Sequence, residues 1–188
     1  MNCSVGIKAT DIGRDLNRGD FTDIYTVSFF GHRQIEDMFR LENALEDIIC
    51  RLLWEKEYVE FLVGRDGDFD QLVSSTVKQC KRKVGDHNSA LIWIQPYPKA
   101  EYLNDEESFH NYYDEIEICD ASASAHFKAA IQLRNRSMID RSHLAVFFVE
   151  QKHGGAYQTM RYAEKKKLPL INLWETIHQS PDTDQNEK

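Results

Sequence analysis

The stretch RNRSMIDRSHLAVFFVEQKHGGAYQTMRYA, residues 134–163, decides the fold. It contains the end of a helix with two arginines, an apolar strand over 143–149, a glycine pair at Gly154 and Gly155, and a second helix. A buried strand that leads through a glycine turn to a helix N-terminus suits an anion, because unpaired backbone N–H groups converge there. The stretch therefore predicts a phosphate site.

The composition is typical of one globular domain. The chain has 188 residues, of which 41% are hydrophobic and 29% charged, so it can bury a full core. Its formal net charge is −8, whereas duplex-DNA binding draws on many lysine and arginine contacts to phosphates. We therefore expect no duplex DNA, and no nucleic acid more generally, as a partner.

The cysteine spacing and the length of the apolar runs indicate whether the chain has a metal site, a secretion signal or a membrane span. The four cysteines, at positions 3, 50, 80 and 119, lack the paired spacing of a metal knuckle, and we expect no metal and no cofactor. No apolar N-terminal segment resembles a signal peptide, and no run of about 18 apolar residues could span a membrane. A reduced, cytoplasmic protein without a membrane partner is predicted.

Apolar runs alternate with helical periods over most of the chain. Strands are predicted at 24–30, 58–63, 90–94, 115–118, 143–149 and 168–173. Helices are predicted at 37–55, 69–80, 122–140 and 157–167. This alternation indicates an α/β fold with a mainly parallel sheet between two helical layers.

The chain divides into a domain and two flanks. Residues 1–23 are expected to form a loose N-terminal extension, 24–178 a single domain, and 179–188 a polar tail. The interval 101–120 holds eight acidic residues and no lysine or arginine, so it alone accounts for the net charge of −8. We expect a solvated acidic loop there, and a mobile lid is the alternative.

Three loops are expected to meet at one edge of the sheet. Right-handed crossovers place the turns that follow parallel strands along one edge, where open α/β sheets bind ligands. The ligand-binding residues predicted in these loops are Gly31, His32, Arg33, Gly64, Arg65, Gly67, Asp70, Gly154, Gly155 and Thr159.

Arg134 adds a cation to this edge. The three-and-four spacing of the 122–140 helix directs Arg134 toward the sheet, and a buried guanidinium needs an anion. That anion is either a ligand phosphate or a protein carboxylate such as Asp140 or Asp70. We include Arg134, Asn135 and Arg136 among the ligand-binding candidates.

Four motifs carry a family resemblance. FFGHR (29–33), VGRDGDFDQL (63–72), RNRSMIDRS (134–142) and HGGAYQTMRYA (153–163) resemble the YpsA-like branch of the SLOG superfamily. This Rossmann-like group also includes the LOG phosphoribohydrolases and DprA-type proteins. The resemblance covers about residues 26–173. It implies a Rossmann-like three-layer sandwich and a pocket for a nucleotide or a nucleotide-derived molecule.

The LOG enzymes carry two motifs that are only partly kept here. Arg134 and Met138 preserve the spacing of the first motif, although Asn135 replaces its lysine. The second motif contains one additional residue, and the place of its catalytic glutamate falls on Arg161 or Tyr162. The LOG-type catalytic glutamate is therefore absent, and it stays open whether the chain is an enzyme.

Asp70 is the candidate replacement for the missing acid. Cleavage of an N-glycosidic bond needs a general acid or base. Asp70 could serve as one, or it could only orient a ligand or stabilise the start of its helix.

Three functions stay open, in this order. A nucleotide-binding module, such as a sensor of a nucleotide-derived signal, comes first. A nucleotide-processing hydrolase, resembling an N-glycosidic phosphoribohydrolase with a non-standard acid, comes second. An assembly protein with a vestigial pocket comes last. The oligomeric state is open, with a homo-oligomer as one option.

Overall fold

The structure of the protein is a computed structural model that describes residues 23–35, 38–123 and 125–179. The expected N-terminal extension and polar tail lie outside these ranges, except for residues 23 and 179. Of the domain predicted over 24–178, only residues 36, 37 and 124 lie outside them.

Six parallel strands form one sheet in the described residues. They are β1 Ile24–Gly31, β2 Tyr58–Val63, β3 Ser89–Gln95, β4 Glu115–Ile118, β5 Leu144–Phe148 and β6 Leu170–Asn172. Their order is β4-β3-β2-β1-β5-β6, and every neighbouring pair is parallel. The predicted α/β fold is confirmed. The order reverses at β1, which makes the carboxyl ends of β1 and β5 a topological switch point.

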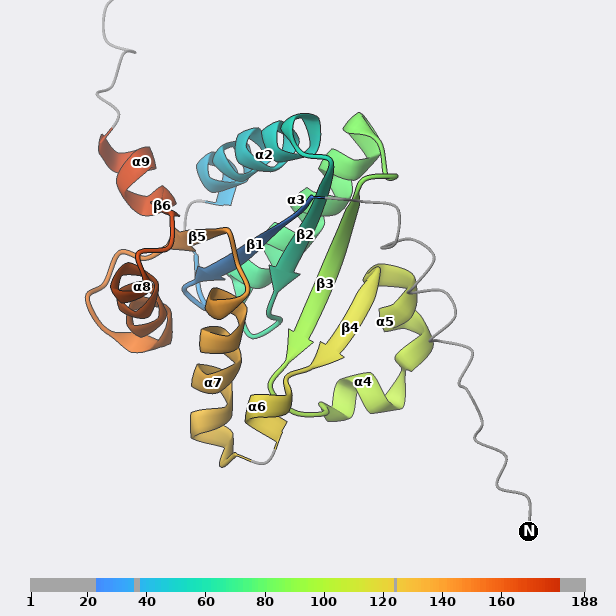
Figure 1. Ribbon diagram of the computed structural model, residues 1–188, viewed down its shortest axis with the longest axis vertical. Coiled ribbons are helices and arrows are strands. Elements are labelled where there is room, and N and C mark those ends of the chain that lie inside the picture. The colour runs from blue at the N-terminus through green and yellow to red at the C-terminus, as the bar shows by residue number, and fades with distance from the viewer. Residues whose placement is uncertain (1–22, 36–37, 124, 180–188) are drawn as a thin grey trace, which may run out of the picture.

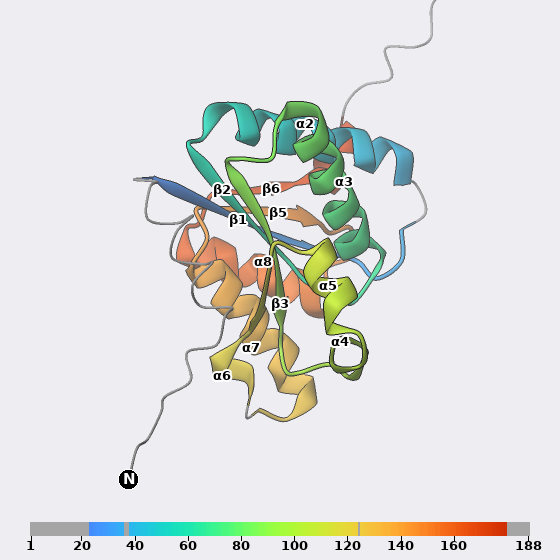
Figure 2. The same ribbon diagram turned by 90° about the vertical axis from the view of Figure 1, so that its right-hand side faces the viewer.

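Helices cover both faces of the sheet, as Figure 1 and Figure 2 show. On one face lie α2 Met38–Glu55, α3 Asp68–Val84 and α9 Leu173–Gln179, and on the other lie α7 Phe127–Asp140 and α8 Gly154–Lys166. None of the helices in the described ranges has both the length and the apolar composition that crossing a bilayer needs. The two helical layers and the sheet form the predicted Rossmann-like three-layer sandwich.

Successive residues of the central strands supply two separate cores. In β1, Val27 and Phe29 join the core under α2 and α3, whereas Phe30 joins the core under α7 and α8. In β2, Phe61 joins the core under α2 and α3, and Leu62 joins the core under α7 and α8. Side chains alternate between the faces of a strand, so a sheet covered on both sides needs continuous apolar runs.

The acidic interval 101–120 is folded rather than a loop, which corrects the prediction. It contains most of α4 Ala100–Asn104, α5 Glu106–Tyr112, the predicted strand β4, and the first residue of α6 Asp120–Ala123. Tyr102, Phe109 and Tyr113 pack around the buried ring of Trp93. The acidic side chains lie mainly on the outer faces of these short elements. The aromatic residues between them hold the elements against the sheet, and the prediction from charge alone did not consider these residues.

Helix boundaries also differ from the predictions. The helix expected at 122–140 is divided into α6 and α7, and the Ser122 hydroxyl holds α6 against β3 by donating to the Pro96 carbonyl at 2.6 Å. Helix α8 begins at Gly154, so the glycine pair forms its first turn. Helix α9 was not predicted, because its residues directly continue the apolar run of β6.

Candidate ligand-binding site

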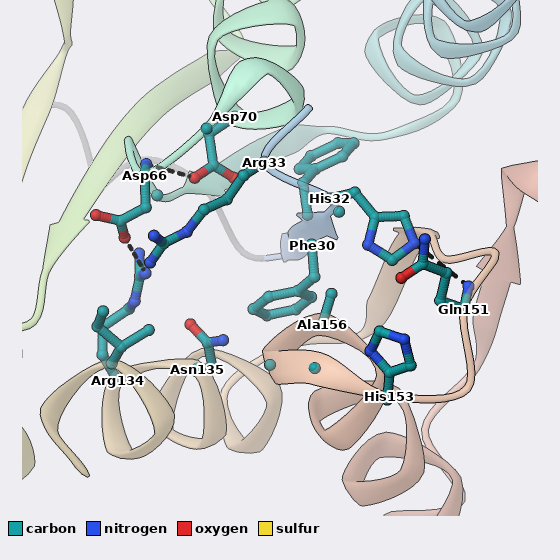
Figure 3. A pocket seen from close by; sticks show the side chains of 17 residues that line it. Phe30, His32, Arg33, Asp66, Asp70, Arg134, Asn135, Gln151, His153 and Ala156 are labelled. Atoms are coloured by element: carbon teal, nitrogen blue, oxygen red, sulfur yellow. Dashed lines mark hydrogen bonds and ion pairs between the residues drawn. The ribbon is translucent and has the colours of Figure 1, made fainter. Parts of the chain in front are cut away.

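A cavity of about 390 Å³ opens at the carboxyl ends of the strands, beside the switch point between β1 and β5. Its walls come from the end of β1, the β2–α3 loop, the middle of α7, and the segment that joins β5 to α8. Figure 3 shows Asp66, Asp70 and Arg134 at one end of the cavity and His32 and His153 at the other. The two ends therefore differ in their chemistry.

Glycines at the ends of two strands allow α3 and α7 to approach the sheet closely. A Cβ on Gly31 would lie 2.3 Å from the Phe69 ring. A Cβ on Gly64 would lie 2.6 Å from Arg134 Nη1 and 2.7 Å from Asp70 Oδ2. A larger residue at position 64 would therefore displace the charged groups that form the acidic end of the cavity.

The N-terminus of α8 is open to the cavity. His153 occupies the N-cap position without a side-chain cap hydrogen bond, and the first turn contains no acidic residue. Gly154 has a φ of 88°, a conformation that favours glycine. A Cβ on Gly154 or Gly155 would meet no atom within 4 Å. Uncapped N–H groups at the positive end of a helix dipole attract an anion.

Helix α3 also begins at the cavity, but its first turn carries Asp68 and Asp70. These acids already complement the positive end of its dipole. Of these two helix starts, the start of α8 is thus the one suited to a phosphate.

Arg134 is paired with a protein carboxylate, although not with either of the two that we had considered. Its Nη2 donates to Asp66 Oδ2 at 2.7 Å, and its Nη1 donates to the Ile94 carbonyl at 3.1 Å. Arg134 is only 4% exposed, and its buried Nε has no hydrogen-bond partner among the described residues. Asp140 lies elsewhere, in an ion pair with Lys166.

Asp66 forms ion pairs with two cations, Lys99 and Arg134. Lys99 Nζ donates to its Oδ1 at 2.6 Å, while Arg134 holds its Oδ2. Burial alone would raise the pKa of Asp66, but Arg134 and Lys99 outweigh it and lower that pKa below the ordinary value. Asp66 therefore stays ionised at neutral pH.

Asp70 has the opposite electrostatics. Burial raises the pKa of its carboxyl, although Arg134 and a hydrogen bond from the Asp66 backbone N–H act against this. That N–H donates to Asp70 Oδ2 at 2.8 Å. Two neighbouring carboxyls whose pKa values move apart are an arrangement found in acid–base sites.

The other end of the cavity contains His32 and His153. The backbone N–H of Glu150 donates to His32 Nε2 at 3.0 Å, and burial lowers the pKa of His32. A neutral ring that accepts at Nε2 carries its proton on Nδ1. This end can therefore offer an uncharged donor to a ligand. Arg33 is exposed and lies against Gly67, and Figure 3 shows its side chain pointing toward Asp66 and Arg134.

Ten of the predicted ligand-binding residues line the cavity. They are Gly31, His32, Arg33, Gly64, Gly67, Asp70, Arg134, Asn135, Gly154 and Gly155. Whether they bind a ligand stays a prediction.

Three predicted residues do not line this cavity. Arg65 turns away and lies over the Phe109 ring. Arg136 is exposed and lies over Tyr162, because two residues along a helix turn the side chain to the opposite side from Arg134. Thr159 is buried below the cavity, where its hydroxyl accepts from Asn135 Nδ2 at 3.1 Å.

Sequence reasoning did not select several lining residues. They include Phe30, Ile131, Gln151, His153 and Ala156. Asp66 also lines the cavity, and the sequence had suggested it only as an acid that supports a hydrolase. His153 directly precedes the glycine pair, so its N-cap position was a usable signal. Ile131 lies one turn before Arg134 on the same helix face, where the spacing argument also placed it, although we did not include it among the ligand-binding candidates.

No protein-family model matches the sequence, and comparison with curated proteins gives no match. Two solved structures are similar. DNA processing protein A (DprA) from Helicobacter pylori aligns with a TM-score of 0.53 and 15% identity over 78% of this chain and 63% of that chain. DprA from Streptococcus pneumoniae aligns with a TM-score of 0.55 and 15% identity over 83% of this chain and 50% of that chain. At this identity the likeness shows the fold alone, and this chain spans less than two thirds of the length of either DprA chain.

The expectation that excluded nucleic acid is wrong. The Helicobacter pylori structure describes a mode of binding single-stranded DNA by DprA, so a protein that contains this fold can take a nucleic-acid partner. Net charge is a poor guide here because the excess of acidic over basic residues lies in the interval 101–120, and none of that interval lines the cavity. Local potential, rather than the total of −8, governs what the cavity can bind.

Proposed function

We propose that the cavity binds a nucleotide or a nucleotide-derived molecule, with its phosphate at the start of α8. The uncapped N-terminus of α8 carries this proposal, because it opens into the cavity without an acid in its first turn. Arg33 lines the same cavity and can add a charge-assisted hydrogen bond to the phosphate.

The rest of the cavity suits a sugar and a base. Its volume of about 390 Å³ falls within the range of about 300–1,000 Å³ that is typical of small-molecule sites. Asp70 and Asp66 can accept hydrogen bonds from sugar hydroxyl groups. Phe30 and Ile131 offer apolar contacts.

The wider comparisons support this proposal. Helicobacter pylori DprA, a protein of the same fold, binds single-stranded DNA, which is a chain of nucleotides. The four sequence motifs favour the YpsA-like branch of the SLOG superfamily, and the absent LOG-type glutamate favours binding over catalysis. We therefore propose a nucleotide-binding module that acts as a sensor.

A hydrolase is the second candidate, and one observation favours it. Asp70 lines the cavity with a raised pKa beside the ionised Asp66. A protonated carboxyl at this place could protonate a leaving base during N-glycosidic cleavage.

Calorimetric titration with a matched panel tests the proposal. Adenosine monophosphate should bind, while adenosine, which lacks the phosphate, should bind much more weakly. Mass spectrometry of small molecules released from the purified protein would identify a co-purified ligand. Binding of a single-stranded oligonucleotide without any binding of mononucleotides would contradict the small-molecule proposal.

A further inference from the structure

A second cavity continues from the first. Its volume is about 750 Å³, and His32, Arg33 and Gln151 line both cavities. Figure 3 shows His32 and Gln151 at the end of the first cavity that lies opposite Asp66. The second cavity therefore extends the site away from its acidic end.

The wall of this second cavity is aromatic. Trp174 meets Phe148 edge to face with ring centroids 5.6 Å apart, and His178 stacks on Trp174 at 3.7 Å. Leu173, which is 1% exposed, fixes the start of α9 in the core. Trp174 is thus held at the cavity by the fold, and a flat aromatic wall is what a stacked nucleobase needs.

The polar groups of the second cavity suit a base rather than a phosphate. Gln34 and Gln151 carry amides that can both donate to and accept from a base edge. Glu150 contributes a carboxylate, which disfavours an anion. The open helix N-terminus belongs to the first cavity, and Arg33 is the cation that the two share.

We propose that the two cavities together bind one molecule that contains two nucleosides joined through phosphate. The phosphate lies at the start of α8, one nucleoside lies toward Asp70, and the second base stacks against Trp174. This inference rests on the proposed function and adds the ligand class. The first cavity has room for about one nucleotide, and the aromatic wall lies beyond it.

Three probes distinguish the sources of such a ligand. They are adenosine monophosphate, an adenosine dinucleotide with a phosphodiester link, and diadenosine pyrophosphate. We expect at least one of the two-base probes to bind about ten-fold or more tightly than the monophosphate, as base stacking on an aromatic ring allows. The two-base probe that binds more tightly shows whether the site prefers a phosphodiester or a pyrophosphate link between the nucleosides.

Trp174→Ala should reduce the affinity for the two-base probe to that of the monophosphate and leave monophosphate binding unchanged. Trp54→Ala is the matched control, because Trp54 is 75% exposed on α2 and lines neither cavity. Trp174→Phe keeps an aromatic ring if the alanine variant folds poorly, and it should retain most of the two-base advantage. We expect the two-base probe to quench tryptophan fluorescence in the wild type, and Trp174→Phe should remove this quenching.

Equal affinity of all three probes for the wild type would overturn this inference while leaving the proposed function intact. An equal loss of monophosphate and two-base binding in both Trp174 variants would also overturn it. Absence of binding by every probe would overturn the inference and the proposed function together.

Discussion

The guanidinium of Arg134 donates to the carboxylate of Asp66 at 2.7 Å inside the cavity wall, and the two residues are not equally replaceable. Asp66 retains a second cation, Lys99, if Arg134 is lost. If Asp66 is lost, the one hydrogen-bond partner that Arg134 keeps among the described residues is the Ile94 carbonyl, with Asp70 as a nearby carboxyl. Breaking the pair therefore removes more of the charge compensation of Arg134 than of Asp66.

Replacing each partner should reveal that asymmetry. Asp66→Ala removes the carboxylate that is hydrogen-bonded to the buried guanidinium and should lower the free energy of unfolding by about 3–5 kcal/mol. Arg134→Met keeps the side-chain length and should cost about 1–3 kcal/mol. Urea unfolding measures both, with the exposed Arg136→Met as the control on the same helix. A larger loss in Arg134→Met than in Asp66→Ala would contradict this account.

Asp70→Asn should stabilise the protein at neutral pH. The raised pKa of Asp70 means that the folded state binds its proton more tightly than the unfolded state does. Its contribution to stability is therefore greatest below the ordinary pKa of 3.8 and is lost as the pH rises through the raised value. Asparagine removes this loss and can still accept from the Asp66 N–H. The melting temperature at pH 7 should rise, and the difference should vanish at acidic pH.

The same variant separates the two candidate functions. If Asp70 only orients a ligand, Asp70→Asn should change nucleotide affinity without removing a reaction, because no step depends on its proton. A wild-type protein that reproducibly cleaves a nucleotide, beside a variant that binds but does not cleave it, would establish the hydrolase. Chromatographic assay of base release provides the measurement.

His32 should make stability depend on pH near neutrality. Its pKa is lowered from 6.5, so the unfolded state binds more protons between the lowered value and 6.5. Stability is complete above this window and falls as the pH decreases through it. His32→Gln can still accept from the Glu150 N–H without titrating, so the wild type should lose more stability on acidification than the variant. His87→Gln, on the exposed α3–β3 turn, should behave like the wild type.

The sequence was informative where a local pattern specifies a structure. Two-sided burial requires continuous apolar runs, and such runs marked the described strands other than the edge strand β4, whose sequence EIEI alternates. Helical spacing alone directed Arg134 toward the sheet, where it now meets the Ile94 carbonyl. Both inferences depend on residues that are neighbours in the chain or one helical turn apart.

The partner of Arg134 could not be predicted in the same way. Asp66 is 68 residues away, on a loop that reaches Arg134 only because Gly64 lets the two segments approach. Pairing between distant loops depends on the packed fold, and the sequence offers several equivalent carboxylates. The prediction of a loop at 101–120 was wrong for a different reason. It relied on the acidic residues of this interval and did not consider the aromatic residues that pack it against Trp93.

Gly155→Val tests the anion site at the start of α8. A Cβ at this position would meet no atom within 4 Å, so the variant should fold with a stability within about 1 kcal/mol of the wild type. Its side chain would project into the space where we place the phosphate and block close backbone approach. Adenosine monophosphate binding should therefore be lost. Ala129→Val, at an exposed position of α7, is the matched control and should bind normally. Normal binding by a folded Gly155→Val protein would remove the start of α8 from the site.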